Sequence, residues 1–178
     1  MRVIFVLLST LALVACAPRS AGPDSPYFAI PEGSTAVLEQ AVTVPSPGVS
    51  VWIQNGAVSS ARNRWEPACK LEMWTRTDSS RTVEPDSFRI ERVARNDRAV
   101  AVDPGFRRVA LDNNAGDGPM AYEMETILYL KSARQPDVHR LVCSYWDSGT
   151  GIVSAFPQHL TFNQIAGTLA GVFRLQLP

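Results

Sequence analysis

The stretch Cys69-Lys70-Leu71-Glu72-Met73 alternates apolar and charged side chains at every position. In an extended strand, successive side chains point to opposite faces, so the apolar and charged residues of this stretch separate onto two faces. A strand with one buried and one solvated face is typical of antiparallel sheets. The stretch therefore predicts an antiparallel β-fold.

A second stretch repeats the pattern and also carries a cysteine. Leu141, Cys143 and Tyr145 alternate with more polar neighbours, which predicts another half-buried strand over 139–146. Bridged cysteines have Cα atoms about 5.5 Å apart. If Cys69 and Cys143 bond, their two strands are neighbours in one sheet or face each other across the core.

Most of the remaining chain alternates short apolar runs with turn residues. We expect further strands over 36–44, 49–54, 69–76, 87–94, 122–131 and 172–177. One helix is well marked. Thr161 and Gln164 have capping-box spacing, Phe162, Ile165, Ala166 and Leu169 form one apolar stripe, and Gly171 suits the C-terminal cap. The expected fold is mainly β (α+β), an antiparallel sheet or sandwich with one C-terminal helix packed on it.

The first sixteen residues differ from the rest. Arg2 is followed by an apolar run over 3–13 and by Leu13-Val14-Ala15-Cys16. A helix over 3–13 reaches about 16 Å, roughly half the hydrocarbon thickness of a bilayer, so it cannot span one. A charged start, a short apolar middle and a small residue at the cleavage position are typical of a removable secretory signal. Alternatively, Cys16 is incidental to an ordinary signal peptide, or the run is a core strand.

This segment resembles the signal peptide and lipobox of bacterial lipoproteins. The resemblance implies that residues 1–15 are removed, and that Cys16 receives a diacylglyceryl thioether and an N-acyl chain such as palmitate. Two or more acyl chains anchor a protein stably in a membrane. Ala17 follows the cysteine where an aspartate would favour inner-membrane retention. The resemblance thus implies the outer membrane, facing the periplasm, with the inner membrane and the cell surface left open.

Residues 16–33 read as a tether and residues 34–178 as a single globular domain. Prolines recur at 18, 23, 26 and 31 and favour an extended, polyproline-like path. At about 3.1 Å per residue such a path spans up to roughly 50 Å. Tyr27, Phe28 and Ile30 are apolar enough to dock on the domain, so only the first part of this segment is expected to be mobile.

Cys69 and Cys143 remain as a pair once Cys16 is lipidated. In an exported protein they are expected to form a disulfide, worth roughly 4 kcal/mol in the chain-entropy model. The alternative is a zinc site that also uses His139 and His159. His139 and Cys143 would lie about 13 Å apart along one strand, too far to share an ion. We therefore expect a disulfide and no metal.

Composition narrows the function. The 17 basic and 17 acidic residues balance, which gives no long-range attraction to nucleic acid. Neither histidine lies in a nucleophile signature, and both read as surface or loop residues. The segment 112–118 with Glu123 partly resembles a calcium loop, but Gly116 and Asp117 break the ligand pattern, and a hairpin turn followed by a strand explains the same residues. We expect no cofactor, no catalytic residues and no nucleic-acid partner.

Two residue classes offer candidate recognition surfaces. The tryptophans and tyrosines provide flat apolar faces with a polar edge for stacking on a sugar, although core filling or sheet packing is the favoured explanation. They are Trp52, Trp65, Trp74, Trp146, Tyr122, Tyr129 and Tyr145. Arginines bind phosphates and carboxylates bidentately, although a solvated strand face also accounts for them. They are Arg89, Arg92, Arg95, Arg98, Arg107 and Arg108. The loop Arg64-Trp65-Glu66-Pro67 is the best candidate patch, and the proposed binding residues are Arg64, Trp65, Glu66 and Trp74.

These features favour a membrane-anchored envelope lipoprotein with a small disulfide-bonded β domain. We expect it to act as a non-enzymatic interaction or structural module that contacts another envelope protein or peptidoglycan. The alternative is a glycan- or lipid-binding module, which needs exposed tryptophans or an apolar cavity. A hydrolase ranks last, because it would need an unrecognised cluster of acid, base and nucleophile in a concave pocket.

Overall fold

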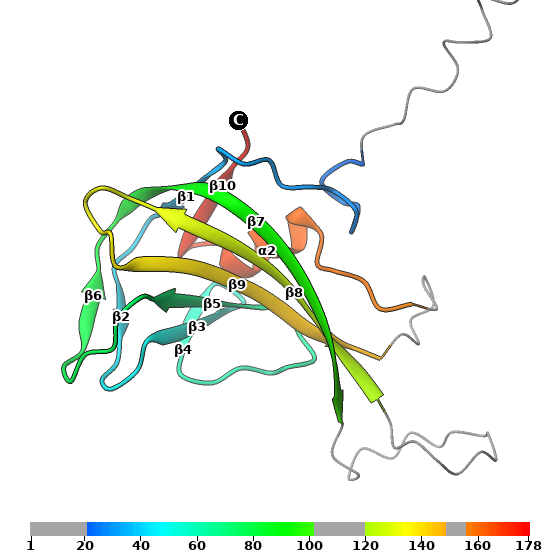
Figure 1. Cartoon of the computed structure of the whole chain (residues 1–178), viewed down its shortest axis with the longest axis horizontal. Coiled ribbons are helices and arrows are strands. Elements are labelled where there is room, and N and C mark those ends of the chain that lie inside the picture. Colours follow the sequence, from blue (N-terminus) through cyan, green and yellow to red (C-terminus); the bar gives the residue numbers. More distant parts are fainter. Residues whose placement is uncertain (1–20, 102–119, 149–155) are drawn as a thin grey trace, which may run out of the picture.

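The computed structural model describes residues 21–101, 120–148 and 156–178, and its main element is one curled antiparallel sheet (Figure 1). The lipobox with Cys16, Arg107, Arg108 and the calcium-like segment 112–118 lie outside the described residues. Of the two arrangements expected from the sequence, the structure has the sheet, with the C-terminal helix packed on it. The expected mainly β fold class is confirmed.

Eight strands form the sheet in the order β10-β1-β7-β8-β9-β5-β3-β4. All neighbours pair antiparallel. A separate ribbon pairs β2 with β6. The strands are β1 (Thr35–Leu38), β2 (Val42–Val44), β3 (Ser50–Gln54), β4 (Ala57–Ser59), β5 (Ala68–Met73), β6 (Arg81–Val83), β7 (Asp86–Ala101), β8 (Met120–Lys131), β9 (Val138–Asp147) and β10 (Phe173–Gln176).

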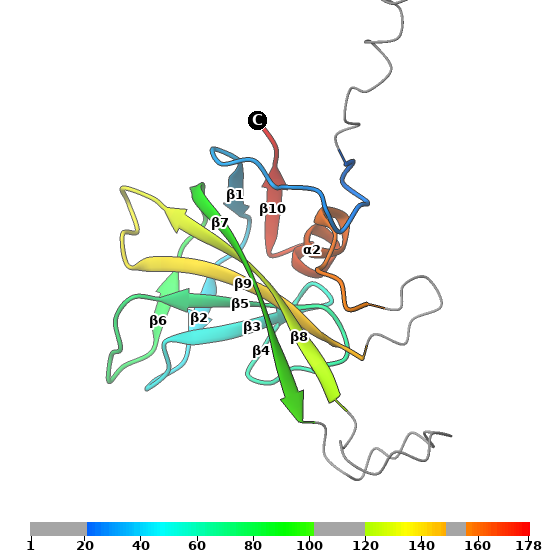
Figure 2. The ribbon, with the colours of Figure 1, turned by 45° about the vertical axis from the view of Figure 1, so that its right-hand side comes forward.

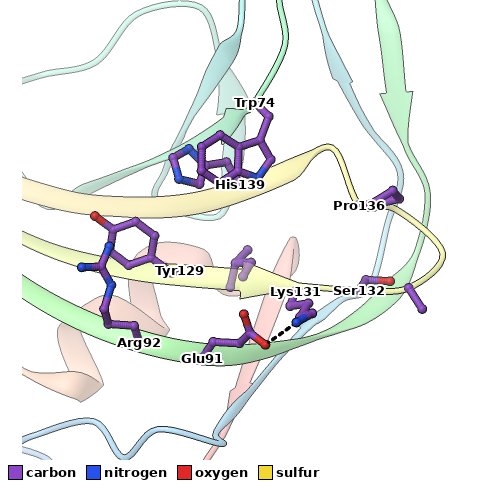
Figure 3. Close-up of a pocket in the computed structure, with 10 residues that line it drawn as sticks. Trp74, Glu91, Arg92, Tyr129, Lys131, Ser132, Pro136 and His139 are labelled. Carbon is purple, nitrogen blue, oxygen red and sulfur yellow. Dashed lines mark ion pairs between the residues drawn. The ribbon is translucent and has the colours of Figure 1, made fainter.

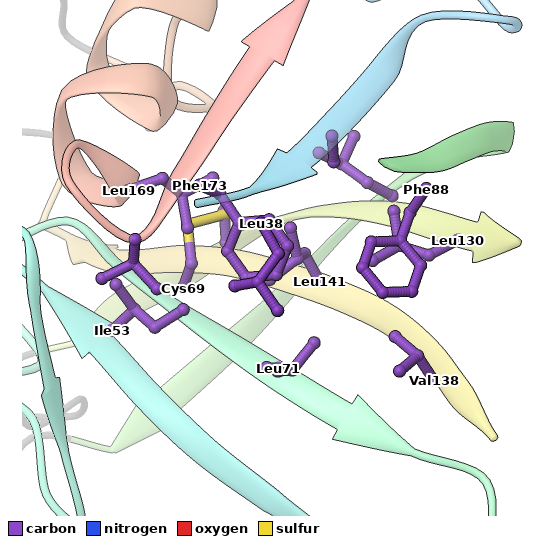
Figure 4. Packing of buried hydrophobic residues seen from close by; sticks show 14 of the residues in the cluster. Leu38, Ile53, Cys69, Leu71, Phe88, Leu130, Val138, Leu141, Leu169 and Phe173 are labelled. Carbon is purple, nitrogen blue, oxygen red and sulfur yellow. A yellow bond between two sulfur atoms is a disulfide. The ribbon is translucent and has the colours of Figure 1, made fainter. Parts of the chain in front are cut away.

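The disulfide lies in the middle of the core. Cys69 of β5 and Cys143 of β9 are direct cross-strand partners and are bonded, which confirms the expected bridge and makes their strands neighbours. We call the face of the sheet that carries them the inner face. Its side chains interdigitate with those of the helix (Figure 4). Among the largest fully buried residues are Leu38, Ile53, Leu71, Phe88, Leu141, Leu169 and Phe173.

The helix α2 (Phe162–Leu169) covers the inner face. The predicted capping box is present, since the Thr161 side chain accepts from the backbone of Gln164 and the Gln164 side chain accepts in return. Ile165 and Leu169 enter the core. The helix contacts β10, β5 and β3, strands from the two ends of the sheet order. It therefore fills the space between the two ends of the curled sheet. No described helix is long and apolar enough to cross a membrane.

The chain before β1 is packed against the helix (Figure 2). The Phe28 ring meets the edge of Phe162 of α2 with centroids 5.9 Å apart, and Ile30 is buried. Arg95 of β7 donates to the carbonyl oxygens of Pro26 and Phe28, both at 2.7 Å. These contacts fix the end of the proline-rich segment on the inner side of the sheet.

The sequence misplaced some strand boundaries. The run 36–44, predicted as one strand, forms β1 and β2 in different sheets. β1 ends at Leu38, and Gln40 is exposed at the position where continued alternation would bury it. The run predicted over 87–94 continues to Ala101 because β8 pairs with it along that length. The short strands β4 and β6 were not predicted, since three residues carry too little alternation to signal a strand.

Candidate functional site: two clusters on the outer face

The outer face of the sheet carries polar and aromatic side chains in two cross-strand rows. Opposed residues of paired strands share a face, so the register determines which side chains meet. The first row consists of Arg98 on β7, Glu123 on β8 and Trp146 on β9. The second row consists of Arg92 on β7, Tyr129 on β8, Arg140 on β9 and Glu72 on β5. The rows are six residues apart along β8, or about 20 Å at 3.4 Å per residue.

The second row borders an open groove of about 530 Å³, shown in Figure 3. We call it the Trp74 groove. Trp74 follows β5 directly and is 63% exposed. Glu91 and Lys131 form an ion pair at its rim, with Nζ and Oε1 2.9 Å apart. The groove is lined by Trp74, Glu91, Arg92, Tyr129, Leu130, Lys131, Ser132, Ala133, Pro136 and His139.

The aromatic rings of the groove form a continuous series. Trp74 stacks on His139 with centroids 3.4 Å apart and planes 21° apart. The His139 centroid lies 5.6 Å from that of Tyr129, and the Arg92 guanidinium lies 3.7 Å above the Tyr129 ring. The register of β5 and β9 shifts after Glu72, where β9 holds one extra residue. This irregularity brings His139 to the outer face beside Trp74.

Burial and neighbouring charges set the charge states of His139 in the groove and of Glu72 beside it. Burial, helped by the charge of Arg140, lowers the pKa of His139 below its usual 6.5. The imidazole is therefore neutral at pH 7, and its buried Nε2 has no hydrogen-bond partner in the described part of the chain. Burial opposes the ionisation of Glu72, but hydrogen bonds from Lys70 and Arg140 outweigh it and lower its pKa. Glu72 thus remains an anion between two cations.

The first row centres on a buried carboxylate. Glu123 is 3% exposed, and its Oε1 accepts from Arg62 and Ser144 while its Oε2 accepts from Arg98. Burial opposes its ionisation, but the hydrogen bonds from Arg62 and Arg98 outweigh it and hold the pKa of Glu123 below the usual 4.5. The guanidinium of Arg62 also lies 4.0 Å above the Trp52 ring. This network fixes the loop before β5 to the outer face of β8.

The loop 60–67 brings two of the predicted binding residues to this cluster. The backbone N–H of Trp146 donates to the Arg64 carbonyl oxygen at 2.7 Å. The guanidinium of Arg64 lies 4.9 Å from the Trp146 ring centroid, and Trp65 meets the same ring edge-on at 5.5 Å. Gln54 braces the loop from β3, because its side chain both donates to and accepts from the backbone of Asn63.

The structure divides the four predicted binding residues. Arg64 and Trp65 lie with Arg62, Arg98, Glu123 and Trp146 in what we call the Trp146 cluster. Trp74 follows the opposite end of β5, about 20 Å away at 3.3 Å per residue. Glu66 accepts from Asn55 and Asn63 and braces its own loop. The sequence offered Tyr129 only as one of the aromatic residues, and it did not single out His139, Arg62 or Glu123 for these clusters. Alternation assigns them to a face, but only the register shows which residues meet.

Both clusters offer noncovalent recognition, since they combine aromatic faces with guanidinium groups and carboxylates. His139 packs between the rings of Trp74 and Tyr129. Among the described residues, no three His, Cys, Asp or Glu side chains converge in a way that could hold a metal ion. No model of a known family, no curated protein and no solved structure matches this chain.

Proposed function

We propose that the chain is a lipoprotein of the bacterial outer membrane that faces the periplasm and binds an envelope partner through the Trp74 groove. The lipobox-like Leu13-Val14-Ala15-Cys16 supports the anchor. The observation that carries the interaction role is the 63% exposed Trp74, held in an open groove beside Arg92 and the Glu91–Lys131 pair. Exposed aromatics with arginine at their side are typical of protein-binding surfaces.

The anchor and the groove lie on opposite sides of the sheet in this proposal. From Cys16 to Ala21 the chain spans at most about 18 Å even when fully extended. From Pro23 onward it is held against α2, since the Asn163 N–H donates to the Pro23 carbonyl oxygen at 3.3 Å and the Asp24 side chain contacts Asn163. The inner side would therefore face the membrane. The Trp74 groove on the outer face would be presented to the periplasm.

Site-specific photocross-linking in living cells tests the interaction role. A photoreactive residue at Ala133, which is exposed and lines the groove, should give one discrete product of higher mass. The same residue at Thr82, exposed on the separate ribbon, serves as the control and should give none. Adding Trp74→Ala should abolish the product from Ala133. Equal products from both positions, or a product unaffected by Trp74→Ala, would contradict the proposal.

A glycan-binding module is the second candidate, because the groove also combines flat rings with an adjacent carboxylate and ammonium. Sugars stack on aromatic faces through their apolar C–H surface and hydrogen-bond to charged groups at the rim. Soluble peptidoglycan fragments should then bind the purified chain in calorimetric titrations. Trp74→Ala should remove this binding, while Trp65→Ala, in the other cluster, should retain it. Absence of heat with the unmodified chain would exclude this candidate.

A further inference from the structure

We propose that the Trp146 cluster holds a binding site for a phosphate group. The site is a hollow of about 340 Å³ on the outer face, separate from the Trp74 groove. We call it the Arg64 hollow. It is lined by Arg62, Arg64, Arg98, Val100, Glu123 and Trp146.

The lining carries more positive than negative charge. Three guanidinium groups surround one carboxylate, and Arg62 and Arg98 already occupy both oxygens of Glu123. The hydrogen bond and the charge of Glu123 raise the pKa of Arg98, and Glu125 adds only a weaker Coulombic attraction. Arg64 has no ion-pair partner in the part of the chain that the structure describes, and it is exposed. An anion in the hollow would compensate the charge that Glu123 leaves unbalanced.

The guanidinium groups of Arg64 and Arg98 border the hollow and have donors that no partner takes up in the described part of the chain. The Arg64 guanidinium lies over the Trp146 ring, and the side chain of Arg98 is 66% exposed beyond its contact with Glu123. The indole Nε1–H of Trp146 is buried and has no hydrogen-bond acceptor among the described residues. Buried donors are rarely left unpaired. A phosphate offers oxygens in three or more directions, whereas a carboxylate offers two, so a phosphate fits these donors better.

The hollow is already organised for such a ligand. Arg62 is held by Ser144, Glu123 and the Trp52 ring, and the backbone of Arg64 is held by the N–H of Trp146. The loop backbone and Arg62 therefore need no ordering when the anion enters, and only the exposed side chains of Arg64 and Arg98 do. Such pre-organisation lowers the entropic cost of binding. The phosphate could belong to a lipid headgroup or to a soluble phosphate.

Chemical-shift titration of the Trp146 indole N–H tests the site directly. The purified full-length chain in detergent is titrated with inorganic phosphate and, separately, with glycerophosphoglycerol, the water-soluble headgroup of phosphatidylglycerol. The matched variants are Arg64→Gln in the hollow and Arg174→Gln, an exposed arginine that pairs with Glu39 away from it. Arg64 makes no ion pair in the described structure, so Arg64→Gln should leave the fold intact.

The proposal predicts a saturable shift of the Trp146 resonance by at least one of the two probes. Arg64→Gln should weaken that binding by about tenfold or more, since a charge-assisted hydrogen bond is lost, and Arg174→Gln should leave it unchanged. Tighter binding of glycerophosphoglycerol would assign the phosphate to a lipid headgroup, and tighter binding of inorganic phosphate to a soluble source. No saturable shift with either probe, or equal affinity in Arg64→Gln, would overturn the proposal. These titrations do not depend on the Trp74 groove or on the anchor.

Discussion

The indole of Trp74 lies face to face with the imidazole of His139, with ring centroids 3.4 Å apart and an interplanar angle of 21°. Trp74 is nevertheless 63% exposed. The stack thus orders a large aromatic side chain while leaving much of its surface to solvent. A rigid exposed ring loses little conformational entropy on binding, which suits it as an anchor for a partner.

Removal of the Trp74 indole should raise the pKa of His139 while lowering the stability of the fold only slightly. Trp74→Ala removes cover from the imidazole, so the lowered pKa of His139 should rise toward its usual 6.5. Since Trp74 is exposed, the free energy of unfolding should fall by less than about 1.5 kcal/mol. NMR titration of the His139 ring protons measures the first effect and urea unfolding the second. A pKa of His139 that is the same in both proteins would contradict the stacking argument.

Glu123 should stabilise the fold at neutral pH and lose that effect in acid. Its pKa is lowered in the folded chain, so its contribution is present above its usual value of 4.5 and is lost as the pH falls through the folded value. At pH 7, Glu123→Gln should cost about 3 kcal/mol, because a buried charge pair is broken while the exposed Arg98 limits the loss. The difference in the free energy of unfolding between the unmodified chain and Glu123→Gln should become smaller below pH 4.5. Urea unfolding at several pH values measures this difference, and a difference independent of pH would count against the ion-pair network.

The disulfide should account for a large share of the stability. Cys69 and Cys143 are separated by 74 residues in the chain. Cross-linking such a loop lowers the entropy of the unfolded state and thereby raises its free energy by about 4 kcal/mol. The double variant Cys69→Ala, Cys143→Ala should therefore unfold at a clearly lower denaturant concentration, as followed by circular dichroism. Its unfolding should be insensitive to reductant, whereas the unmodified chain should approach it when reduced. If reduction left the midpoint of the unmodified chain in place, the bridge would contribute nothing.

Arg95 should hold the segment before β1 on the domain. Its two hydrogen bonds to the carbonyl oxygens of Pro26 and Phe28 would be lost in Arg95→Ala. Hydrogen exchange at the Phe28 amide, which donates to Ser25, should then become faster. Arg92→Ala, on the same strand but on the outer face, is the matched control and should leave this exchange unchanged. Equal exchange in both variants would mean that the aromatic contact with Phe162 holds the segment alone.

Local patterns predicted the elements well, because each pattern is set by neighbouring residues. The alternation in 69–73 and the capping box of Thr161 and Gln164 reappear in β5 and α2. Alternation also assigned the charged side chains to the face opposite the cysteines. The bridge between Cys69 and Cys143 could be predicted because covalent chemistry leaves few pairings for two cysteines.

The clusters could not be predicted, because they depend on strand register and on loops. Arg98, Glu123 and Trp146 meet only because β7, β8 and β9 pair in one particular register, and a slip of one residue would separate them. His139 reaches Trp74 only through the irregularity between β5 and β9. Arg64, Trp65, Glu66 and Trp74 are all exposed, but the sequence did not show that they divide between two clusters.

Intact-mass spectrometry of the chain extracted from bacterial membranes tests the lipid anchor most directly. The proposed lipoprotein predicts a polypeptide that begins at Cys16 and carries the added mass of a diacylglyceryl group and an N-linked acyl chain. Cys16→Ser should prevent both the modification and the removal of residues 1–15. An extracted chain that begins elsewhere, or one with an unmodified thiol at Cys16, would contradict the anchored module.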